Sequence, residues 1–288
     1  MSTYQGIRGL KVRDYTTNPD NPLEGQLWYN KTDQVGKYQI PNVTASWRTG
    51  NNMNTARSQL AGAGTQASSL VFGGEPGPPA NTADTEAYDG TSWTEVNNLN
   101  TARRYVTGTG AVGTQALAVS GWLDPGQASQ VESWNGSNWT ETTDVNTARY
   151  SGGAAGTYTS ALFFGGINPP GGFSANTESW NGSAWTEVAD LNTARQSSAA
   201  TGADNTSCLS SGGNSGSVTA VVESWNGSAW TETTDVNTAR QELGGSGIQT
   251  ATVVFGGAEP SVSAKTELWN GSSWSEQNDL STARKTVA

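Results

Sequence analysis

The tripeptide Thr-Ala-Arg occurs six times in this sequence at nearly constant spacing. Its arginines are Arg57, Arg103, Arg149, Arg195, Arg240 and Arg284, which are 46, 46, 46, 45 and 44 residues apart. A tryptophan stands ten residues before each of them, at Trp47, Trp93, Trp139, Trp185, Trp230 and Trp274. A period of this length indicates a solenoid or a propeller, in which each repeat buries its apolar faces only against neighbouring repeats.

Each repeat carries the signals of four short strands and no helical periodicity. A stretch of small residues such as Ser58–Gly64 follows the arginine and fits an inner strand at the crowded axis of a propeller. An apolar run such as Leu162–Phe164, followed by Gly-Gly, fits a strand covered on both faces. The stretch Glu178–Trp185 has Asn-Gly between two aromatic residues, a strong hairpin signal because both residues tolerate positive φ. The sequence therefore predicts an all-β protein made of four-stranded antiparallel blades.

The order of these elements resembles a known repeat. Arginine, a small-residue strand, an apolar strand ending in Gly-Gly, Glu-x-aromatic and tryptophan follow one another as in the kelch repeat, over roughly residues 47 to 284. The resemblance implies a kelch-like β-propeller. One turn departs from it, because Asn-Gly-Ser replaces the Asp-Pro common in kelch repeats.

The number of blades depends on how the ring closes. Full repeats are expected at 57–102, 103–148, 149–194, 195–239 and 240–283. We expect a sixth blade from residues 25–56 and 284–288, with Gly25–Asn30 and Gly36–Ile40 as strands, because an open ring leaves unpaired sheet edges. Residues 1–24 would then be an attachment segment and 25–288 the propeller. The alternative is five blades with residues 1–50 as a separate segment.

The N-terminal segment carries a second resemblance. Residues 21–39 read NPLEGQLWYNKTDQVGKYQ, which is similar to short segments in tail and virion proteins of marine bacteriophages. This resemblance covers about 20 residues. It implies a virion structural protein.

The repeated arginines and tryptophans are expected to serve the fold, because a residue that recurs in every blade usually answers to the repeat. A glutamate stands two residues before the third-strand aromatic of each full repeat, at Glu86, Glu132, Glu178, Glu223 and Glu267. We expect each arginine to pair with such a glutamate and each tryptophan to pack between blades. An anion-binding ring of arginines and a sugar-binding array of tryptophans are the alternatives.

Binding residues are expected where the repeat is broken, because variable loops on a rigid scaffold usually carry binding. The connection between the second and third strands differs in every repeat. It holds Trp122, the one tryptophan outside the repeat pattern, and Phe173 in a comparable loop. With Asp124, Asn168 and Glu75 they form a candidate surface suited to a glycan. The alternative is that these loops are only solvated.

The composition argues against several classes of function. The net charge of −10 disfavours nucleic acid and anionic membrane surfaces, and neither a membrane-inserting run nor a secretory signal is expected. Histidine is absent and no metal-ligand cluster or phosphate loop stands out, so we expect no metal, no cofactor and no catalytic residue. Cys208 stands where other repeats have a small residue, and it is expected to be buried.

Together these features predict a non-catalytic structural or adhesion protein of a bacteriophage virion, assembled in the host cytoplasm. Its expected partners are a host-surface glycan or receptor, or neighbouring virion proteins, bound through the propeller loops, and a homo-oligomer is compatible with this. The alternatives are a general protein–protein interaction propeller and a polysaccharide-active enzyme.

Overall fold

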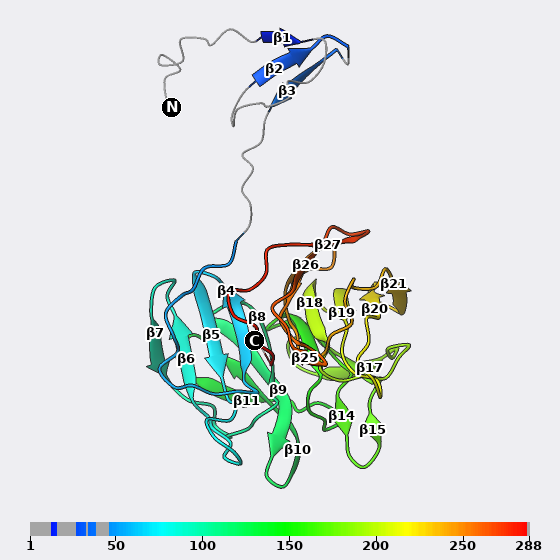
Figure 1. The fold of residues 1–288 in the computed structure, drawn as a ribbon. Coiled ribbons are helices and arrows are strands. Elements are labelled where there is room, and N and C mark those ends of the chain that lie inside the picture. Colours follow the sequence, from blue (N-terminus) through cyan, green and yellow to red (C-terminus); the bar gives the residue numbers. More distant parts are fainter. Residues whose placement is uncertain (1–12, 16–26, 33, 39–45, 287–288) are drawn as a thin grey trace. The chain divides into compact units, whose positions relative to one another are not determined.

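The computed structural model describes residues 13–15, 27–32, 34–38 and 46–286 (Figure 1). These residues form strands, turns and bends, and no helix is found among them. The chain divides into two compact units, Met1–Ser46 and Trp47–Ala288. The prediction of an all-β protein is thus confirmed for the part of the chain that the structure describes.

The described strands of the first unit form one three-stranded sheet. β2 (Leu27–Asn30) pairs in parallel with β1 (Arg13–Tyr15) along one edge and antiparallel with β3 (Val35–Tyr38) along the other. The prediction that these residues form part of a sixth blade is therefore wrong, because both edges of β2 are already hydrogen-bonded within this sheet. Of the predicted attachment segment 1–24, residues 1–12 and 16–24 lie outside the described residues.

The second unit contains five four-stranded antiparallel sheets among its described residues, each with its strands in chain order. Blade 1 is β4 (Ala61–Thr65), β5 (Ser68–Phe72), β6 (Thr85–Tyr88) and β7 (Trp93–Val96). Blade 2 is β8 (Thr107–Val112), β9 (Gln115–Leu123), β10 (Gly126–Trp134) and β11 (Trp139–Thr142). Blade 3 is β12 (Gly153–Thr157), β13 (Ser160–Phe164), β16 (Thr177–Trp180) and β17 (Trp185–Val188).

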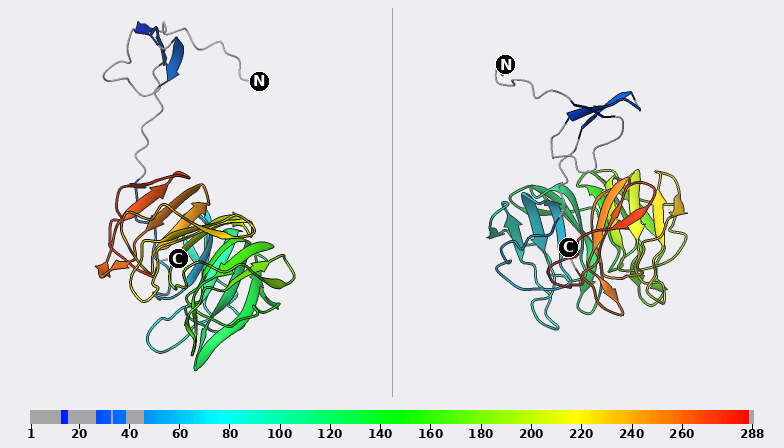
Figure 2. Two further views of the ribbon diagram at one scale, coloured as in Figure 1. Left: turned by 90° about the vertical axis from the view of Figure 1, so that its right-hand side faces the viewer. Right: turned by 45° about the horizontal axis from the view of Figure 1, so that its top comes forward.

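Blade 4 is β18 (Ala199–Asp204), β19 (Ser207–Ser211), β20 (Val222–Trp225) and β21 (Trp230–Thr233). Blade 5 is β22 (Gly244–Ile248), β23 (Ala251–Phe255), β26 (Thr266–Trp269) and β27 (Trp274–Glu276). Two small hairpins project from the blades, β14 (Ile167–Asn168) with β15 (Gly172–Phe173) and β24 (Ala258–Glu259) with β25 (Ser261–Val262). The five-blade alternative is confirmed, and the arrangement is consistent with a kelch-like propeller (Figure 2).

The first strand of each blade lies innermost, beside the first strand of the next blade. β4, β8, β12, β18 and β22 follow one another in this way. Small residues permit the close approach: a Cβ added at Gly108 would lie 2.7 Å from the carbonyl oxygen of Gly62 and 2.9 Å from the ring of Phe72. A Cβ at Gly153 would lie 2.9 Å from the Cβ of Ala200.

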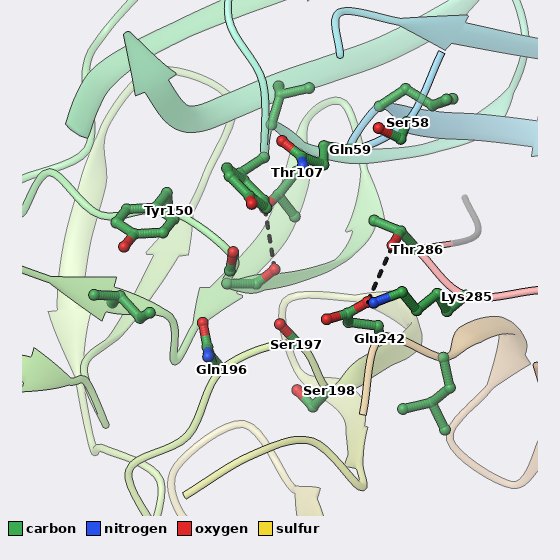
Figure 3. Close-up of a pocket in the computed structure, with 17 residues that line it drawn as sticks. Ser58, Gln59, Thr107, Tyr150, Gln196, Ser197, Ser198, Glu242, Lys285 and Thr286 are labelled. Carbon is green, nitrogen blue, oxygen red and sulfur yellow. Dashed lines mark hydrogen bonds and ion pairs between the residues drawn. The ribbon is translucent and has the colours of Figure 1, made fainter. Parts of the chain in front are cut away.

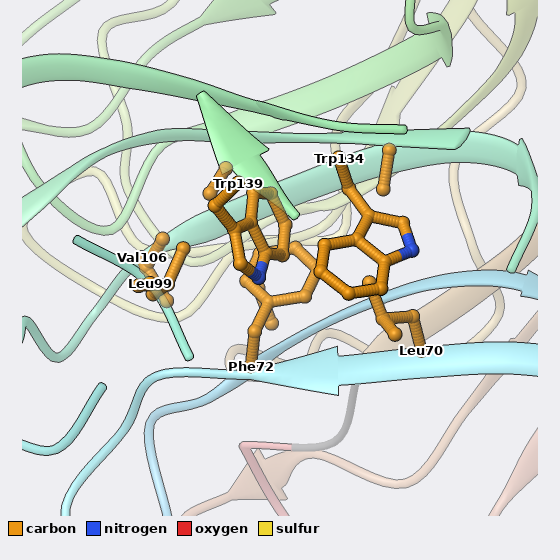
Figure 4. Close-up of a cluster of buried hydrophobic side chains, with 9 residues drawn as sticks. Leu70, Phe72, Leu99, Val106, Trp134 and Trp139 are labelled. Atoms are coloured by element: carbon orange, nitrogen blue, oxygen red, sulfur yellow. The ribbon is translucent and has the colours of Figure 1, made fainter. Parts of the chain in front are cut away.

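The hydrophobic core is divided into clusters, each shared by two successive blades. In the first, Leu70 and Phe72 of blade 1 contact Trp134 and Trp139 of blade 2 (Figure 4). The rings of Phe72 and Trp139 meet edge to face, with centroids 4.8 Å apart. Three further clusters join the later blades in the same way. The tryptophans therefore pack between blades, and each blade completes its core only with the help of the next.

The hairpin predicted between the third and fourth strands forms, but only the glycine of its Asn-Gly pair has positive φ. Trp134 and Trp139 face each other in the sheet register, so the loop between them has four residues. Gly136 has φ 93°, whereas Asn135 does not have positive φ. The side-chain oxygen of Asn135 instead accepts hydrogen bonds from the backbone N–H groups of Ser137 at 3.0 Å and Asn138 at 2.9 Å. The asparagine therefore acts through its side chain, as in an Asx turn.

The first five repeat arginines each lie against the glutamate of their own blade. The N–O distances are 3.2 Å for Arg57–Glu86, 2.7 Å for Arg103–Glu132, 2.8 Å for Arg149–Glu178, 3.1 Å for Arg195–Glu223 and 2.7 Å for Arg240–Glu267. All five arginine side chains are fully buried.

Blade 3 illustrates why the motif is Asn-Thr-Ala-Arg and not arginine alone. One oxygen of Glu178 accepts hydrogen bonds from the backbone and side-chain nitrogens of Asn146, at 2.7 and 2.9 Å. The other accepts from Arg149 at 2.8 Å and from the backbone of Thr147 at 3.3 Å. Arg149 also donates to the carbonyl of Phe163 at 3.2 Å. Burial lowers the pKa of Arg149, and the carboxylate of Glu178 opposes that shift.

We expect Gly108→Ala to lower the free energy of unfolding by about 1–3 kcal/mol, because the new methyl group would overlap the neighbouring inner strand. Gly126→Ala is the matched control, since a Cβ there meets no atom within 4 Å. Denaturant unfolding followed by tryptophan fluorescence measures both changes. Equal stability of the two variants would contradict the close approach of β8 to β4.

Arg149→Gln should lower the free energy of unfolding by about 3–5 kcal/mol, because it leaves the carboxylate of Glu178 buried without its cation. Arg284→Gln changes the same motif position, where the arginine is exposed. It should alter the free energy of unfolding by no more than about 0.5 kcal/mol. A similar loss for both variants, measured by thermal denaturation, would argue against the buried pairs as the source of stability.

Candidate ligand-binding site

A collar of six residues surrounds the propeller axis. Each is the second residue after a repeat arginine, and each has a left-handed backbone that is uncommon outside glycine. They are Gln59 (φ 56°), Tyr105 (50°), Ser151 (56°), Ser197 (54°), Glu242 (56°) and Thr286 (54°). Backbone hydrogen bonds of 2.9 Å run from Tyr105 to Gln59, and from Thr286 through Glu242 and Ser197 to Ser151. The collar is therefore a built feature of the ring, and its side chains vary from repeat to repeat.

The collar and its neighbours line a cavity of about 550 Å³ (Figure 3). Most of its side chains are neutral and polar. They include the hydroxyl groups of Ser58, Thr107, Ser151, Ser197, Ser198 and Thr286 and the amides of Gln59 and Gln196. The two charged residues of the lining neutralise each other, since Lys285 lies 3.2 Å from Glu242. Tyr105 and Tyr150 supply aromatic surface.

The variable loops begin beside this cavity. The residue that follows each of the first five repeat arginines pairs with the residue that follows the glycine pair (Ser-Gly in blade 2) at the end of the second strand. The pairs are Ser58 with Glu75, Arg104 with Trp122, Tyr150 with Ile167, Gln196 with Asn214 and Gln241 with Ala258. The loops predicted to bind ligand and the axial cavity therefore share one face of the propeller.

Trp122 and Asp124 come together with residues of the cavity wall. The ring of Trp122 meets that of Tyr150 edge to face at 5.0 Å, and its indole N–H donates to Asp124 at 2.9 Å. Arg104 lies 2.9 Å from the other carboxylate oxygen of Asp124. These two hydrogen-bonding partners lower the pKa of Asp124. The rings of Tyr105 and Tyr150 are tilted by 45° to each other, with centroids 5.5 Å apart. We call Trp122, Tyr150 and Tyr105 the aromatic rim.

The other three predicted residues lie on the neighbouring loops of blades 1 and 3. Glu75 is half-buried and pairs through its backbone with Ser58 at the cavity wall. Asn168 and Phe173 belong to the β14–β15 hairpin, where the backbone of Asn168 accepts from Gly171 at 2.7 Å. Phe173 pairs with Ile167 at the end of the hairpin away from its turn and is 39% exposed. A hydrogen bond of 3.3 Å from Gln127 to Pro169 joins this hairpin to the loop of blade 2.

The sequence interpretation missed the collar. A signal was present, because the second residue after each nearly constant Asn-Thr-Ala-Arg is Gln, Tyr, Ser, Ser, Glu or Thr. A position that varies close to a constant motif is a candidate for binding when the fold places it at the axis. The left-handed backbone at these positions is known only from the structure, so nothing in the sequence indicates that the collar residues face a cavity.

The chemistry available on this face is recognition through hydroxyl, amide and aromatic groups. Among residues 46–286, no group of three or more Cys, Asp or Glu side chains is placed to hold a metal ion. Cys208 is fully buried in β19, and burial raises the pKa of its thiol to about 12. The described residues also include no helix long and apolar enough to cross a membrane.

The sequence matches no model of a known protein family and no curated protein.

We expect Cys208 to resist alkylation in the folded protein at about pH 8.5, the ordinary pKa of a thiol. Burial leaves the thiolate on the order of a thousand times rarer than in the unfolded chain, so labelling should slow by at least about 100-fold. Mass spectrometry after iodoacetamide treatment, with and without denaturant, measures this. Equal labelling in both states would mean that β19 is open to solvent.

Proposed function

We propose that the propeller is a non-catalytic binding module that recognises a neutral, hydroxyl-rich ligand, of which a glycan is the best example, at the axial cavity and its aromatic rim. The observation that carries the proposal is the composition of this face. Neutral hydroxyl and amide groups line the cavity, and aromatic rings flank it. Such groups offer both donors and acceptors to sugar hydroxyls, while tyrosine and tryptophan offer apolar surface to a sugar ring.

The electrostatics of the site support an uncharged ligand. Glu242 and Lys285 are paired with each other, and Arg104 is paired with Asp124. An anionic ligand such as a phosphate would have to displace one of these carboxylates before it gained a cation. A sugar can bind beside both pairs without breaking them.

An adhesion role in a bacteriophage virion is the biological setting that we propose for this binding. It rests on the similarity of residues 21–39 to virion proteins of marine bacteriophages. Detection of the chain in purified virions by mass spectrometry tests it independently of the ligand. Absence from virions would leave a propeller that binds its ligand elsewhere.

Replacing Trp122 by alanine tests the ligand-binding face. We expect binding on a glycan array and to whole cells to fall by at least about 30-fold, the usual effect of removing a central aromatic contact. Val112→Ala is the control, because Val112 is 39% exposed and ends the inner strand of the same blade, away from the loops. Both variants should keep the melting temperature of the parent within about 4 °C.

Two results would count against this proposal. Glycan binding that survives Trp122→Ala and is lost with Val112→Ala would place the site on the other face. Release of reducing ends from a bound polysaccharide would identify the propeller as an enzyme instead.

A further inference from the structure

Blade 4 differs from the other blades in the strand behind the cavity wall. Its second strand, β19 (Ser207–Ser211), reads Ser-Cys-Leu-Ser-Ser. At the position of Ser210 the other four blades have apolar residues, which are Val71, Ala118, Phe163 and Val254. The side chain of Ser210 is nonetheless fully buried. A buried hydroxyl group needs hydrogen-bond partners, so the partners of Ser210 indicate its role.

Ser210 links a buried arginine to the axial cavity. The Nε–H of Arg195 donates to the hydroxyl oxygen of Ser210 at 3.3 Å, and Ser210 donates to the hydroxyl oxygen of Ser198 at 3.0 Å. The direction of this chain is fixed, because a guanidinium group has only donors and the single hydroxyl hydrogen of Ser210 then goes to Ser198. Ser198 lines the cavity next to Ser197 (Figure 3). A chain of donors therefore runs from Arg195 to the cavity.

This donor chain occurs in one blade of the five. The Nε atoms of the other four buried repeat arginines have no hydrogen-bond partner among the described residues; these are Arg57, Arg103, Arg149 and Arg240. The residues at the position of Ser198 in the other blades also line the cavity and have no hydroxyl group; these are Leu60, Val106, Gly152 and Leu243. A chain that the fold required would recur in every blade. The two serines of blade 4 therefore point to a role at the cavity.

The last hydrogen of the donor chain is available to a ligand. The hydroxyl oxygen of Ser198 accepts from Ser210, and no acceptor for its own hydrogen is found in the part of the chain that the structure describes. Hydrogen bonds in a chain polarise one another, and this chain begins at the positive charge of Arg195. Ser198 is therefore a stronger donor than an isolated serine, and it favours a strong acceptor on the ligand.

The wall around Ser198 favours an acceptor that carries no hydrogen. The corresponding residues of blades 1, 2 and 5 are apolar, and Leu243 belongs to the blade next to that of Ser198. A sugar hydroxyl that accepted from Ser198 would need an acceptor for its own hydrogen, which these apolar side chains do not offer. A carbonyl oxygen of an amide needs none. The methyl group of an acetamido substituent can in addition contact the apolar side chains.

A carboxylate is the other strong acceptor that a sugar could offer. Glu242 already brings one carboxylate to this cavity, where it lies 3.2 Å from Lys285. The charge of Arg195 is held behind the wall by Glu223, at 3.1 Å. A uronic acid would therefore add a second carboxylate to a wall whose cations are already paired, and like charges in one site disfavour each other. The amide carbonyl is the strongest acceptor that remains.

We propose that the ligand of the axial cavity is a sugar with an acetamido group, and that Ser198 donates to the carbonyl oxygen of this group. Arg195 and Ser210 are positioning residues, which set the direction and strength of the donor without touching the ligand. The inference rests on the proposed glycan-binding function and names the substituent that the site selects. A site built to donate to one group discriminates against a ligand that lacks it.

The test uses pairs of glycans on an array that differ only by an acetamido or a hydroxyl group at carbon 2. Chitotriose with cellotriose is one pair, and oligosaccharides of N-acetylgalactosamine and of galactose form another. We expect the parent chain to bind the acetamido member of a pair at least about tenfold more tightly than the hydroxyl member. Ser198→Ala should abolish this preference, because it removes the donor.

Two variants of Ser210 test the donor chain behind the wall. Ser210→Val should lower the preference by at least about threefold and leave binding of the hydroxyl members unchanged, because it breaks the link to Arg195. Valine stands at this position in blades 1 and 5, so the fold accommodates its shape. Ser210→Thr keeps the hydroxyl group on that same shape, and it should keep the preference.

Ser151→Ala is the matched control. Ser151 also lines the cavity, and no hydrogen bond from its hydroxyl group to a charged side chain is found among residues 46–286. Its replacement should weaken both members of a pair by a similar factor, which leaves the preference unchanged. All four variants should keep the melting temperature of the parent within about 4 °C.

The glycan array also separates this inference from the proposed function. Equal binding of both members of every pair, or a preference that survives Ser198→Ala, would overturn the acetamido site and leave the glycan-binding function standing. A loss of preference with Ser151→Ala equal to that with Ser198→Ala, or tighter binding of glucuronic acid oligosaccharides than of acetamido sugars, would do the same. Binding to no glycan on the array would contradict the proposed function itself, and the acetamido site with it.

Discussion

The ring depends on the buried ion pair between each repeat arginine and the glutamate of its blade. A lone charge in this setting would cost several kcal/mol, so neither partner is tolerated without the other. The glutamate does more than neutralise the arginine, because it also accepts hydrogen bonds from the backbone of the incoming connection, as Glu178 does from Asn146 and Thr147. One carboxylate thus fixes the path by which the chain leaves one blade and enters the next. This explains why the four residues Asn-Thr-Ala-Arg recur together.

The apolar contacts extend the same dependence around the ring. The fourth-strand tryptophans of blades 2 to 5 each contact the blade before their own, so these blades share their cores with their neighbours. Repeat proteins of this kind are stabilised by nearest-neighbour interfaces, and their terminal repeats need a cap. Here Trp47 partly caps blade 5 and leaves Leu268 41% exposed. On blade 1, Tyr88 and Trp93 are likewise only half-buried, so the outer face of this terminal blade is also incompletely covered.

The features that repeat were predictable from the sequence, and those that do not repeat were placed only by the structure. Arginine, glutamate and tryptophan recur because every blade needs them, so their spacing predicted the sheets and the packing between them. The collar side chains vary from repeat to repeat, and the property common to all six residues is a left-handed backbone within a ring of tertiary hydrogen bonds. The sixth Thr-Ala-Arg led to the expectation of a sixth blade, whereas the described residues form five. The strand-like residues at 25–40 were misassigned because β1 and β3 occupy the two edges of β2.

The last described residues complete the wall of the axial cavity beside blade 5. Lys285 and Thr286 line the cavity, and both contact Glu242. Three backbone hydrogen bonds hold this segment to blade 5, because Gly257 donates to Arg284, Arg284 donates to Ser263 and Thr286 donates to Glu242. This part of the wall is therefore ordered by the ring itself, and a ligand that binds beside it does not have to order it.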